Sequence, residues 1–357
     1  MKTKTIWKLH SWLGLLAGIP LLVIALSGSL LVFKDDLNRL LIPGKVFVES
    51  RPEGPLPMAE RLAALQEGLP EHEVVGWALY DEPERSDWVY VMAHGDDEWL
   101  HVYQNPYTGE ILGEPVASDS EFMGWLLELH YTFLAGHVGM AVCGVLAILL
   151  CLLGLTGFLI YRKFWKSFFT FRWRTSLRLL GGNLHKRVGV VSAPVFLILG
   201  ITGAVWNIDH VLHELEHIAE DGGDHEHYKM AERLYADELP LDAMRAASRE
   251  AIPGFQVNYI SFPWEPGVDI TFWGSFEGQS SLRGPYHSTV AFDARSGDYL
   301  RHSRIDEASV WKQTYDAFEP LHFGTFGGLV TKVFWCVLGA APGFLAVTGC
   351  LVWWKRR

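Results

Sequence analysis

Histidine is the residue type in this sequence best suited to hold a cofactor, and 15 histidines are present. Only four of them recur when the two halves of the chain are compared with each other. His10 matches His185 at an offset of 175 residues, and His130 matches His322 at an offset of 192 residues. If a pseudo-two-fold axis relates the halves, each matched pair places two imidazoles face to face. Two opposed imidazoles are the axial ligands that a six-coordinate b-type haem requires, so the pattern predicts two haem b sites.

Small residues recur in the same register as these histidines. Glycines near the four positions leave room for a flat macrocycle against helix backbones, although close helix packing also uses small residues. The sequence contains no Cys-x-x-Cys-His, which excludes covalent attachment of the c type. Interfacial histidines hydrogen-bonded to loops or lipid headgroups remain the alternative interpretation. The recurring pairs are Gly14 with Gly189, Ser27-Gly28 with Thr202-Gly203, and Thr156-Gly157 with Thr348-Gly349.

His137 is a candidate without a counterpart, because the matching position in the second half is Leu329. On a helix that continues from His130, His137 would lie two turns deeper on the same face. An ionisable residue within a membrane span is a functional candidate by default. His137 is therefore a candidate axial ligand, in addition to His130 or in its place, although the internal symmetry does not support it.

A second histidine cluster competes with this interpretation. His213-Glu214-Leu215-Glu216-His217 matches the HExxH motif, which on a helix places two imidazoles one turn apart beside a carboxylate base, as in zinc peptidases. No third ligand at the usual spacing follows, and residues 221–224 are expected to end the helix. Three alternatives stay open for this stretch: a solvated loop, metal binding, or a peptidase site. Its candidate metal ligands are His213, His217, His225 and His227.

Four uncharged runs are long enough to position these residues in a membrane. They cover about residues 12–33, 138–161, 188–208 and 333–354, and each has roughly the 20 residues that a helix needs to cross a bilayer. We interpret the first run as a retained anchor rather than a signal peptide, because no small-x-small cleavage site follows it. The sequence therefore predicts an α-helical membrane protein with four transmembrane helices.

Charge placement predicts the orientation of these helices. Residues 162–187 carry eight Lys or Arg and no acidic residue, and both chain ends are basic. By the positive-inside rule, both termini and this loop face the cytoplasm, and residues 34–137 and 209–332 lie on the outer side. All 41 acidic residues fall in these two outer segments. The formal net charge of −11 disfavours a nucleic-acid partner.

The two outer segments resemble each other as well. Residues 102–112 and 290–300 both read as a strand, a turn and a second strand, with Gly109 or Gly297 where the turn needs a positive φ. Each half of the chain is therefore a span, an outer α+β domain and a span, in a tandem repeat of parallel orientation. The predicted order is a span within residues 1–33, a domain at 34–137, a span at 138–161, a basic loop at 162–187, a span at 188–208, a domain at 209–332, and a last span with its tail at 333–357.

This layout resembles the PepSY-associated transmembrane family of bacterial inner membranes over nearly the whole chain. The resemblance rests on Trp7-Lys8-Leu9-His10-Ser11-Trp12-Leu13-Gly14, Leu129-His130, Asn183-Leu184-His185-Lys186 and Leu321-His322-Phe323-Gly324, and on the turns with Gly109-Glu110 and Gly297-Asp298. Family members include ferric-siderophore reductases that bind two haems. The resemblance thus implies PepSY-like periplasmic domains and haem-dependent reduction of a ferric siderophore or another ferric chelate, which releases Fe(II).

No segment of this sequence is expected to bind NAD or FAD as an electron donor. The sequence has no Gly-x-Gly-x-x-Gly fingerprint of a dinucleotide-binding domain, so electrons would come from a quinol or a separate donor. The alternative from a different class is a non-enzymatic periplasmic anchor whose PepSY-like domains bind or modulate a peptidase. The zinc peptidase is a third hypothesis.

Overall fold

The computed structural model describes residues 3–166, 168–170, 176–221 and 228–354. The chain divides into two compact units. The first, which we call the helical unit, comprises Met1–Lys34, Phe122–Gly223 and Glu319–Arg357. The second, the sheet unit, comprises Asp35–Glu121 and Asp224–Phe318.

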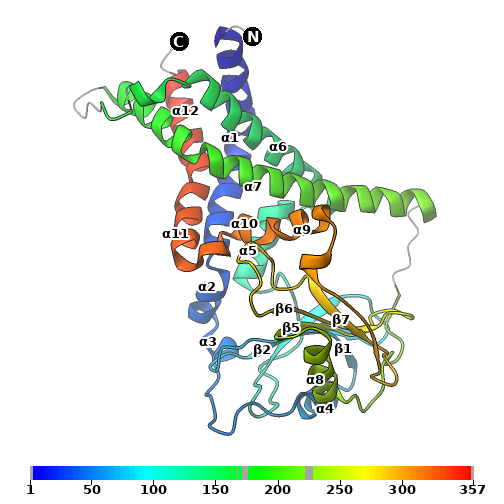
Figure 1. Ribbon diagram of the computed structural model, residues 1–357. Coiled ribbons are helices and arrows are strands. Elements are labelled where there is room, and N and C mark those ends of the chain that lie inside the picture. Colours follow the sequence, from blue (N-terminus) through cyan, green and yellow to red (C-terminus); the bar gives the residue numbers. More distant parts are fainter. Residues whose placement is uncertain (1–2, 167, 171–175, 222–227, 355–357) are drawn as a thin grey trace. The chain divides into compact units, whose positions relative to one another are not determined.

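The helical unit contains the four predicted spans as helices (Figure 1). They are α1 (Thr3–Leu31), α6 (Gly136–Ile160), the first 40 residues of α7 (Leu177–Asp221), and the segment Thr325–Trp354, which joins η3 (Thr325–Gly327), α11 (Gly328–Gly339) and α12 (Ala341–Trp354). Each is long and apolar enough to cross a bilayer. Helix α6 packs along α7, and α1 packs along α12. The start of α1 and the end of α12 lie at the same end of the unit (Figure 1).

Two short helices lead into the second and fourth spans, and the first of them corrects a prediction. Helix α5 (Phe122–Thr132) ends before α6 begins, because Phe133, Leu134 and Gly136 have φ values of 51°, 59° and 53°. Left-handed residues cannot continue a right-handed helix. We expected His130 and His137 to lie on one face of a continuous helix. This expectation is wrong, because the break separates them onto two helices. Helix α10 (Phe318–Phe323) precedes α11 in the same way.

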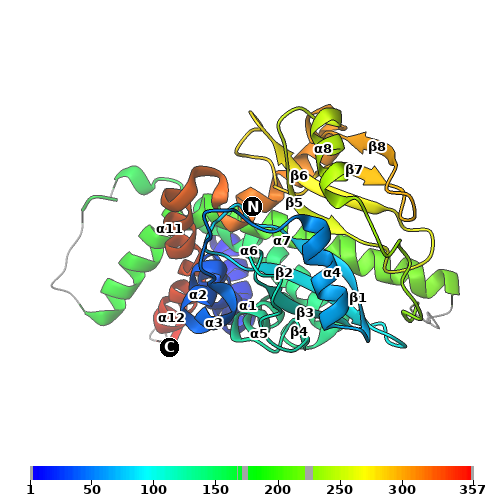
Figure 2. The same cartoon turned by 90° about the horizontal axis from the view of Figure 1, so that it is seen from below.

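The sheet unit holds one antiparallel sheet in the order β4-β3-β2-β1-β5-β6-β7-β8. The two outer segments, which we predicted as separate α+β domains, contribute four strands each and pair through β1 and β5, where Trp77 lies opposite Ile260. Figure 2 shows the two sets of strands. This pairing protects two strand edges that separate domains would expose. The strands are β1 (His72–Ala78), β2 (Asp87–Ala93), β3 (Trp99–Gln104), β4 (Val116–Ala117), β5 (Phe255–Ser261), β6 (Ile270–Phe276), β7 (Ser288–Phe292) and β8 (Tyr299–Ser303).

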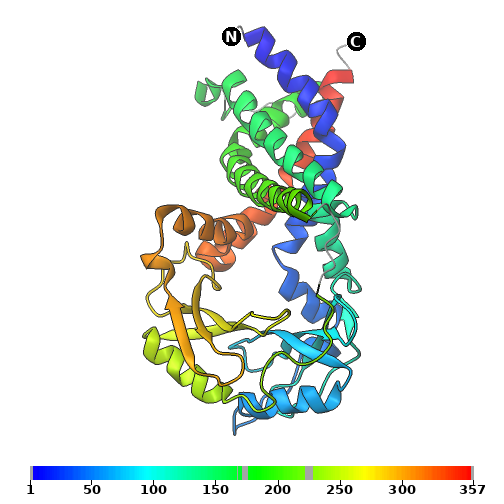
Figure 3. The same cartoon turned by 90° about the vertical axis from the view of Figure 1, so that its right-hand side faces the viewer.

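One hydrophobic core serves both sets of strands. Helices α4 (Met58–Gly68) and α8 (Leu241–Ala251) cover the same face of the sheet (Figure 3), and Trp77, Phe272 and Phe292 are buried beneath them. The predicted turns are confirmed, since Gly109 and Gly297 have φ values of 75° and 74°. The remaining short elements are α2 (Lys34–Leu41), α3 (Pro43–Val46), η1 (Phe164–Lys166), η2 (Ile305–Glu307) and α9 (Val310–Asp316).

Candidate functional site

The four recurring histidines meet in the two predicted pairs within the helical unit. The ring centres of His10 on α1 and His185 on α7 are 6.3 Å apart, and those of His130 on α5 and His322 on α10 are 6.5 Å apart. With metal–nitrogen bonds of about 2.0 Å and ring centres about 1.1 Å further out, two imidazoles on opposite sides of one metal ion have centres roughly 6.2 Å apart. Both pairs therefore have the spacing of a bis-imidazole metal site.

Each of the four rings is held through Nδ1 by a hydroxyl group from a neighbouring helix. In every case this hydroxyl belongs to a Ser or Thr that directly precedes a glycine, which makes the arrangement the same at all four positions. The pairs are His10 with Thr156 at 2.9 Å, His130 with Ser27 at 3.1 Å, His185 with Thr348 at 3.0 Å, and His322 with Thr202 at 2.6 Å.

These hydrogen bonds fix the tautomer of the rings. Each hydroxyl donates its single proton to the carbonyl oxygen four residues earlier, at Leu152, Val23, Phe344 and Ile198 respectively. It must therefore accept from Nδ1, which carries the ring proton and leaves a lone pair on Nε2. The contact of His130 Nδ1 with the Ile24 carbonyl at 3.0 Å agrees, because a carbonyl only accepts. In the described part of the chain no hydrogen bond engages Nε2 of these rings, so each presents the nitrogen that ligates metals.

The glycine after each hydroxyl residue lies against the corresponding histidine ring, most tightly at Gly28. A Cβ atom at Gly28 would lie 2.5 Å from Cε1 of His130, which is closer than real carbon contacts. The corresponding distances are 3.5 Å for Gly203 and His322, 3.3 Å for Gly157 and His10, and 3.3 Å for Gly349 and His185. The Ser/Thr-Gly pairs that recur in the sequence therefore hold and seat the rings.

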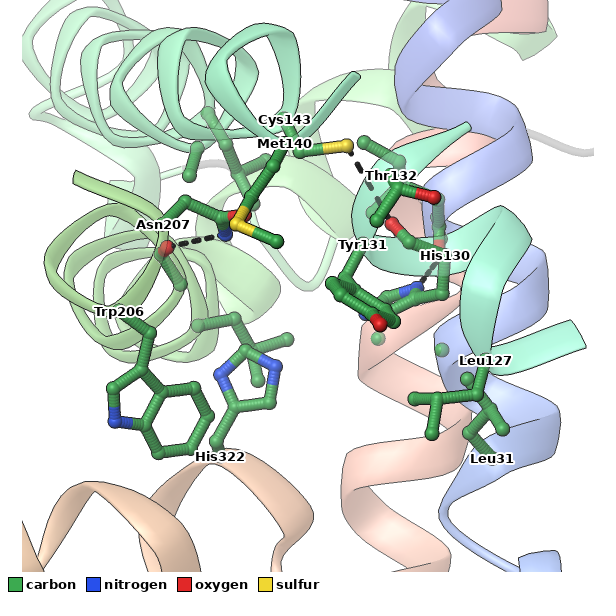
Figure 4. Close-up of a pocket in the computed structure, with 18 of the residues that line it drawn as sticks. Leu31, Leu127, His130, Tyr131, Thr132, Met140, Cys143, Trp206, Asn207 and His322 are labelled. Atoms are coloured by element: carbon green, nitrogen blue, oxygen red, sulfur yellow. Dashed lines mark hydrogen bonds between the residues drawn. The ribbon is translucent and has the colours of Figure 1, made fainter. Parts of the chain in front are cut away.

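The histidine pairs lie in two cavities of the helical unit. The one lined by His130 and His322, which we call the 130/322 cavity, has a volume of about 600 Å³. The one lined by His10 and His185, the 10/185 cavity, has about 360 Å³. Both fall within the range of roughly 300–1,000 Å³ that is usual for cofactor sites. Figure 4 shows His130 and His322 facing each other from opposite walls, with Trp206 beside His322. The cavities adjoin, because both are lined by Leu21, Leu150 and Pro342.

The electrostatics of the 130/322 cavity favour ligation by neutral imidazoles. Burial lowers the pKa of His130 to about 4, and burial together with the neighbouring His130 lowers the pKa of His322 to about 3. A neutral ring keeps the Nε2 lone pair that a metal needs. The hydroxyl of Ser29, which also lines this cavity, is buried without a hydrogen-bond partner. This hydroxyl is therefore available for a hydrogen bond to water or to a polar group of a ligand.

His137 packs against His210 of α7, whereas its place in the sequence made it a candidate axial ligand with or instead of His130. It lies near the start of α6, lines the 130/322 cavity, and stacks on His210 of α7 with ring centres 5.9 Å apart and planes 11° apart. Its Nδ1 lies 3.9 Å from the carboxylate of Glu214. His210 was missed as a site residue, although its spacing of four residues from Glu214 places both on one face of α7 and was a usable signal.

The HExxH segment lies on a helix, since α7 extends to Asp221, so the alternative of a loop is wrong for residues 213–217. The His213 side chain is 75% exposed and its Nδ1 lies 3.6 Å from Glu216. The side chain of His217, and all of His225 and His227, lie outside the described residues. Among the residues that the structure does describe, no group of three or more His, Cys, Asp or Glu is arranged to hold a metal ion. Metal binding by this segment stays a prediction.

Comparison with known proteins gives a family match over nearly the whole chain. The family model described as "PepSY-associated TM region" matches residues 7–356. Among curated proteins, the chain is similar to the Pseudomonas aeruginosa protein "Uncharacterized protein PA4219", with 24% identity over 255 residues. That match covers 65% of this chain and 63% of the relative's length.

Proposed function

The chain belongs to the PepSY-associated transmembrane family, and from this premise we propose that it is a haem b reductase that passes electrons across the bacterial inner membrane to a periplasmic ferric chelate. The observation that carries this proposal is the pair of bis-imidazole sites with ring centres 6.3 Å and 6.5 Å apart. In each, both rings present Nε2 and a glycine seats each ring. Haem b bound there supplies one-electron redox chemistry.

We further propose that electrons pass from the 10/185 cavity to the 130/322 cavity. Along α1, the 17 residues between His10 and Ser27 correspond to about 26 Å, a long distance for two sites at opposite ends of the spans. The shared lining residues Leu21, Leu150 and Pro342 shorten the gap, because the cavities adjoin at one layer of side chains. The basic segment 162–187 supports a cytoplasmic location for the 10/185 side. A quinol or a separate protein would donate the electrons.

The sheet unit is strongly acidic, which favours some charges of the ferric chelate over others. Residues 35–121 and 224–318 contain 34 Asp or Glu and 14 Lys or Arg, a formal charge of −20. Such a field concentrates cations and repels highly anionic chelates. One electron converts Fe(III) to Fe(II), which binds more weakly to hard oxygen ligands because its charge is lower. We therefore propose a neutral or cationic ferric siderophore, such as a hydroxamate complex, as the substrate, with Fe(II) as the product.

The direct test is the haem content and redox behaviour of the purified protein. After expression with ample haem supply, a pyridine haemochrome assay is expected to give two haems b per chain. The Soret band should shift on reduction with dithionite and return when a ferric hydroxamate chelate is added without oxygen, with one haem oxidised per iron reduced. A colourless protein would leave the non-enzymatic PepSY anchor, or the zinc peptidase if zinc is bound.

The HExxH segment provides a second test, because a peptidase and a haem reductase need different histidines. The double change of His213 and His217 to Ala is expected to leave the rate of ferric reduction within about twofold of the unmodified protein, since neither position recurs in the other half of the chain. The measurement is anaerobic chelate reduction at matched haem content. Loss of reduction with both haems retained would instead make the segment part of the catalytic machinery.

A further inference from the structure

The propionate groups of a haem in the 130/322 cavity would need partners other than the axial histidines. Haem b carries two propionate groups that leave one edge of the macrocycle and are anionic at neutral pH. Burying them requires cationic or hydrogen-bonding partners. Arg178 and Lys186 line the 10/185 cavity and can fill this role there. Among the described residues that line the 130/322 cavity there is no Lys or Arg, and Glu128 adds a carboxylate.

Most polar groups of the 130/322 cavity already have partners within the protein. The Tyr131 hydroxyl donates to Glu128, the Thr132 hydroxyl donates to the backbone carbonyl of Glu128, and the Asn207 amide donates to the carbonyl of Gly203. The axial rings use Nδ1 for their own hydroxyl partners. Apart from that axial pair, the imidazoles of this lining belong to His137 and His210, and the Glu214 carboxylate lies 3.9 Å from Nδ1 of His137.

The arrangement of these two imidazoles matches two neighbouring carboxylates. They come from adjacent helices, α6 and α7, and their planes are 11° apart with centres 5.9 Å apart. Two nearly parallel donors at the side of a cavity suit two side chains that leave one edge of a flat ligand. His137 is the second residue of α6, at the end of that span, and its side chain is 61% exposed. Carboxylates at the end of a span cost less to bury than carboxylates at its centre. From this geometry and the missing Lys or Arg, we infer that His137 and His210 bind the propionates of the haem in the 130/322 cavity.

This inference rests on the proposed function and gives His137 a role other than axial ligation. The matched variants are the double change of His137 and His210 to Ala, the double change of both to Arg, and His213→Ala as a control on the same helix α7. His213 is 75% exposed and does not line the cavity. The readouts are haem transfer to excess apomyoglobin, the midpoint potential of each haem, and the low-spin ferric signals in electron paramagnetic resonance.

In the double Ala variant, both bis-imidazole signals are expected to persist, because His130 and His322 remain. Loss of one haem to apomyoglobin should become about a hundredfold faster, because two charge-assisted hydrogen bonds are lost and each corresponds to about a factor of ten. The midpoint potential of the same haem should fall, since uncompensated propionate charge stabilises the ferric state. The Arg variant should restore both properties, and His213→Ala should change neither.

The outcomes separate this inference from the proposed function. An unmodified protein without haem would contradict the proposed function itself. Two haems with unchanged transfer rates and potentials in the double Ala variant would overturn the propionate assignment alone. Loss of an axial signal in His137→Ala would also overturn it and would return His137 to the ligand set. Zn²⁺ binding that depends on His137 and His210 in the haem-loaded protein would instead identify the pair as a metal site.

Discussion

Replacing His322 by Ala is expected to remove the same haem as replacing His130 by Ala, so that each variant should retain one haem b per chain instead of the two proposed for the unmodified protein. The reason is geometric. The two imidazoles face each other at 6.5 Å although they lie 192 residues apart, so one metal ion can bind both. Losing either ligand destroys one bis-imidazole site. Pyridine haemochrome assays and low-temperature electron paramagnetic resonance of the ferric protein measure this loss.

The two double variants sharpen this expectation. Changing His130 and His322 together should cost little more haem than changing one of them, because residues that act as a unit are not additive. His10 and His185 should behave in the same way toward the other haem, with no coupling between the two pairs. Haem and imidazole added together should restore the low-spin signal in single variants, since the opposite ring remains. Additive losses of two different haems in the double change of His130 and His322 would contradict the shared site.

The internal comparison of the sequence could predict the histidine pairs, because residues that face each other across two similar halves recur in register. It could also predict the spans, since about 20 uncharged residues have few alternatives to a membrane helix. Turn glycines such as Gly109 and Gly297 were predictable for a similar reason, because a positive φ excludes most other residues. In each case a local physical requirement restricts the residue type.

The features that sequence could not predict depend on contacts between distant segments. The join of β1 to β5 is set by which strand edges remain free, and no residue pattern marks it. The break between α5 and α6 falls at Phe133 and Leu134, which have no helix-breaking composition, so His137 was placed on the wrong face. The stacking of His137 on His210 needs the packing of α6 on α7. The hydroxyl partner of each imidazole likewise lies more than 100 residues away.

The Ser/Thr-Gly pairs that contact the histidine rings provide the second variant with a large expected effect on haem content. In this variant none of the four paired histidines is changed. Gly28→Ala is expected to remove the haem of the 130/322 cavity as completely as His130→Ala does. The new Cβ would lie 2.5 Å from Cε1 of His130, so the ring must move. The ring has little freedom to move without loss, because its Nδ1 is held by Ser27 and by the Ile24 carbonyl. A displaced ring no longer aligns Nε2 with His322.

Gly203→Ala is the matched control, because Gly203 follows the hydroxyl residue that holds His322 on the opposite wall of the same cavity. There the new Cβ would lie 3.5 Å from Cε1 of the ring, which is ordinary van der Waals contact. Gly203→Ala should therefore keep two haems b per chain, whereas Gly28→Ala should keep one. Both substitutions add one methyl group to a helix, so helix propensity cannot explain a difference between them. Equal haem content in the two variants would show that the close contact at Gly28 does not hold His130 in its ligating position.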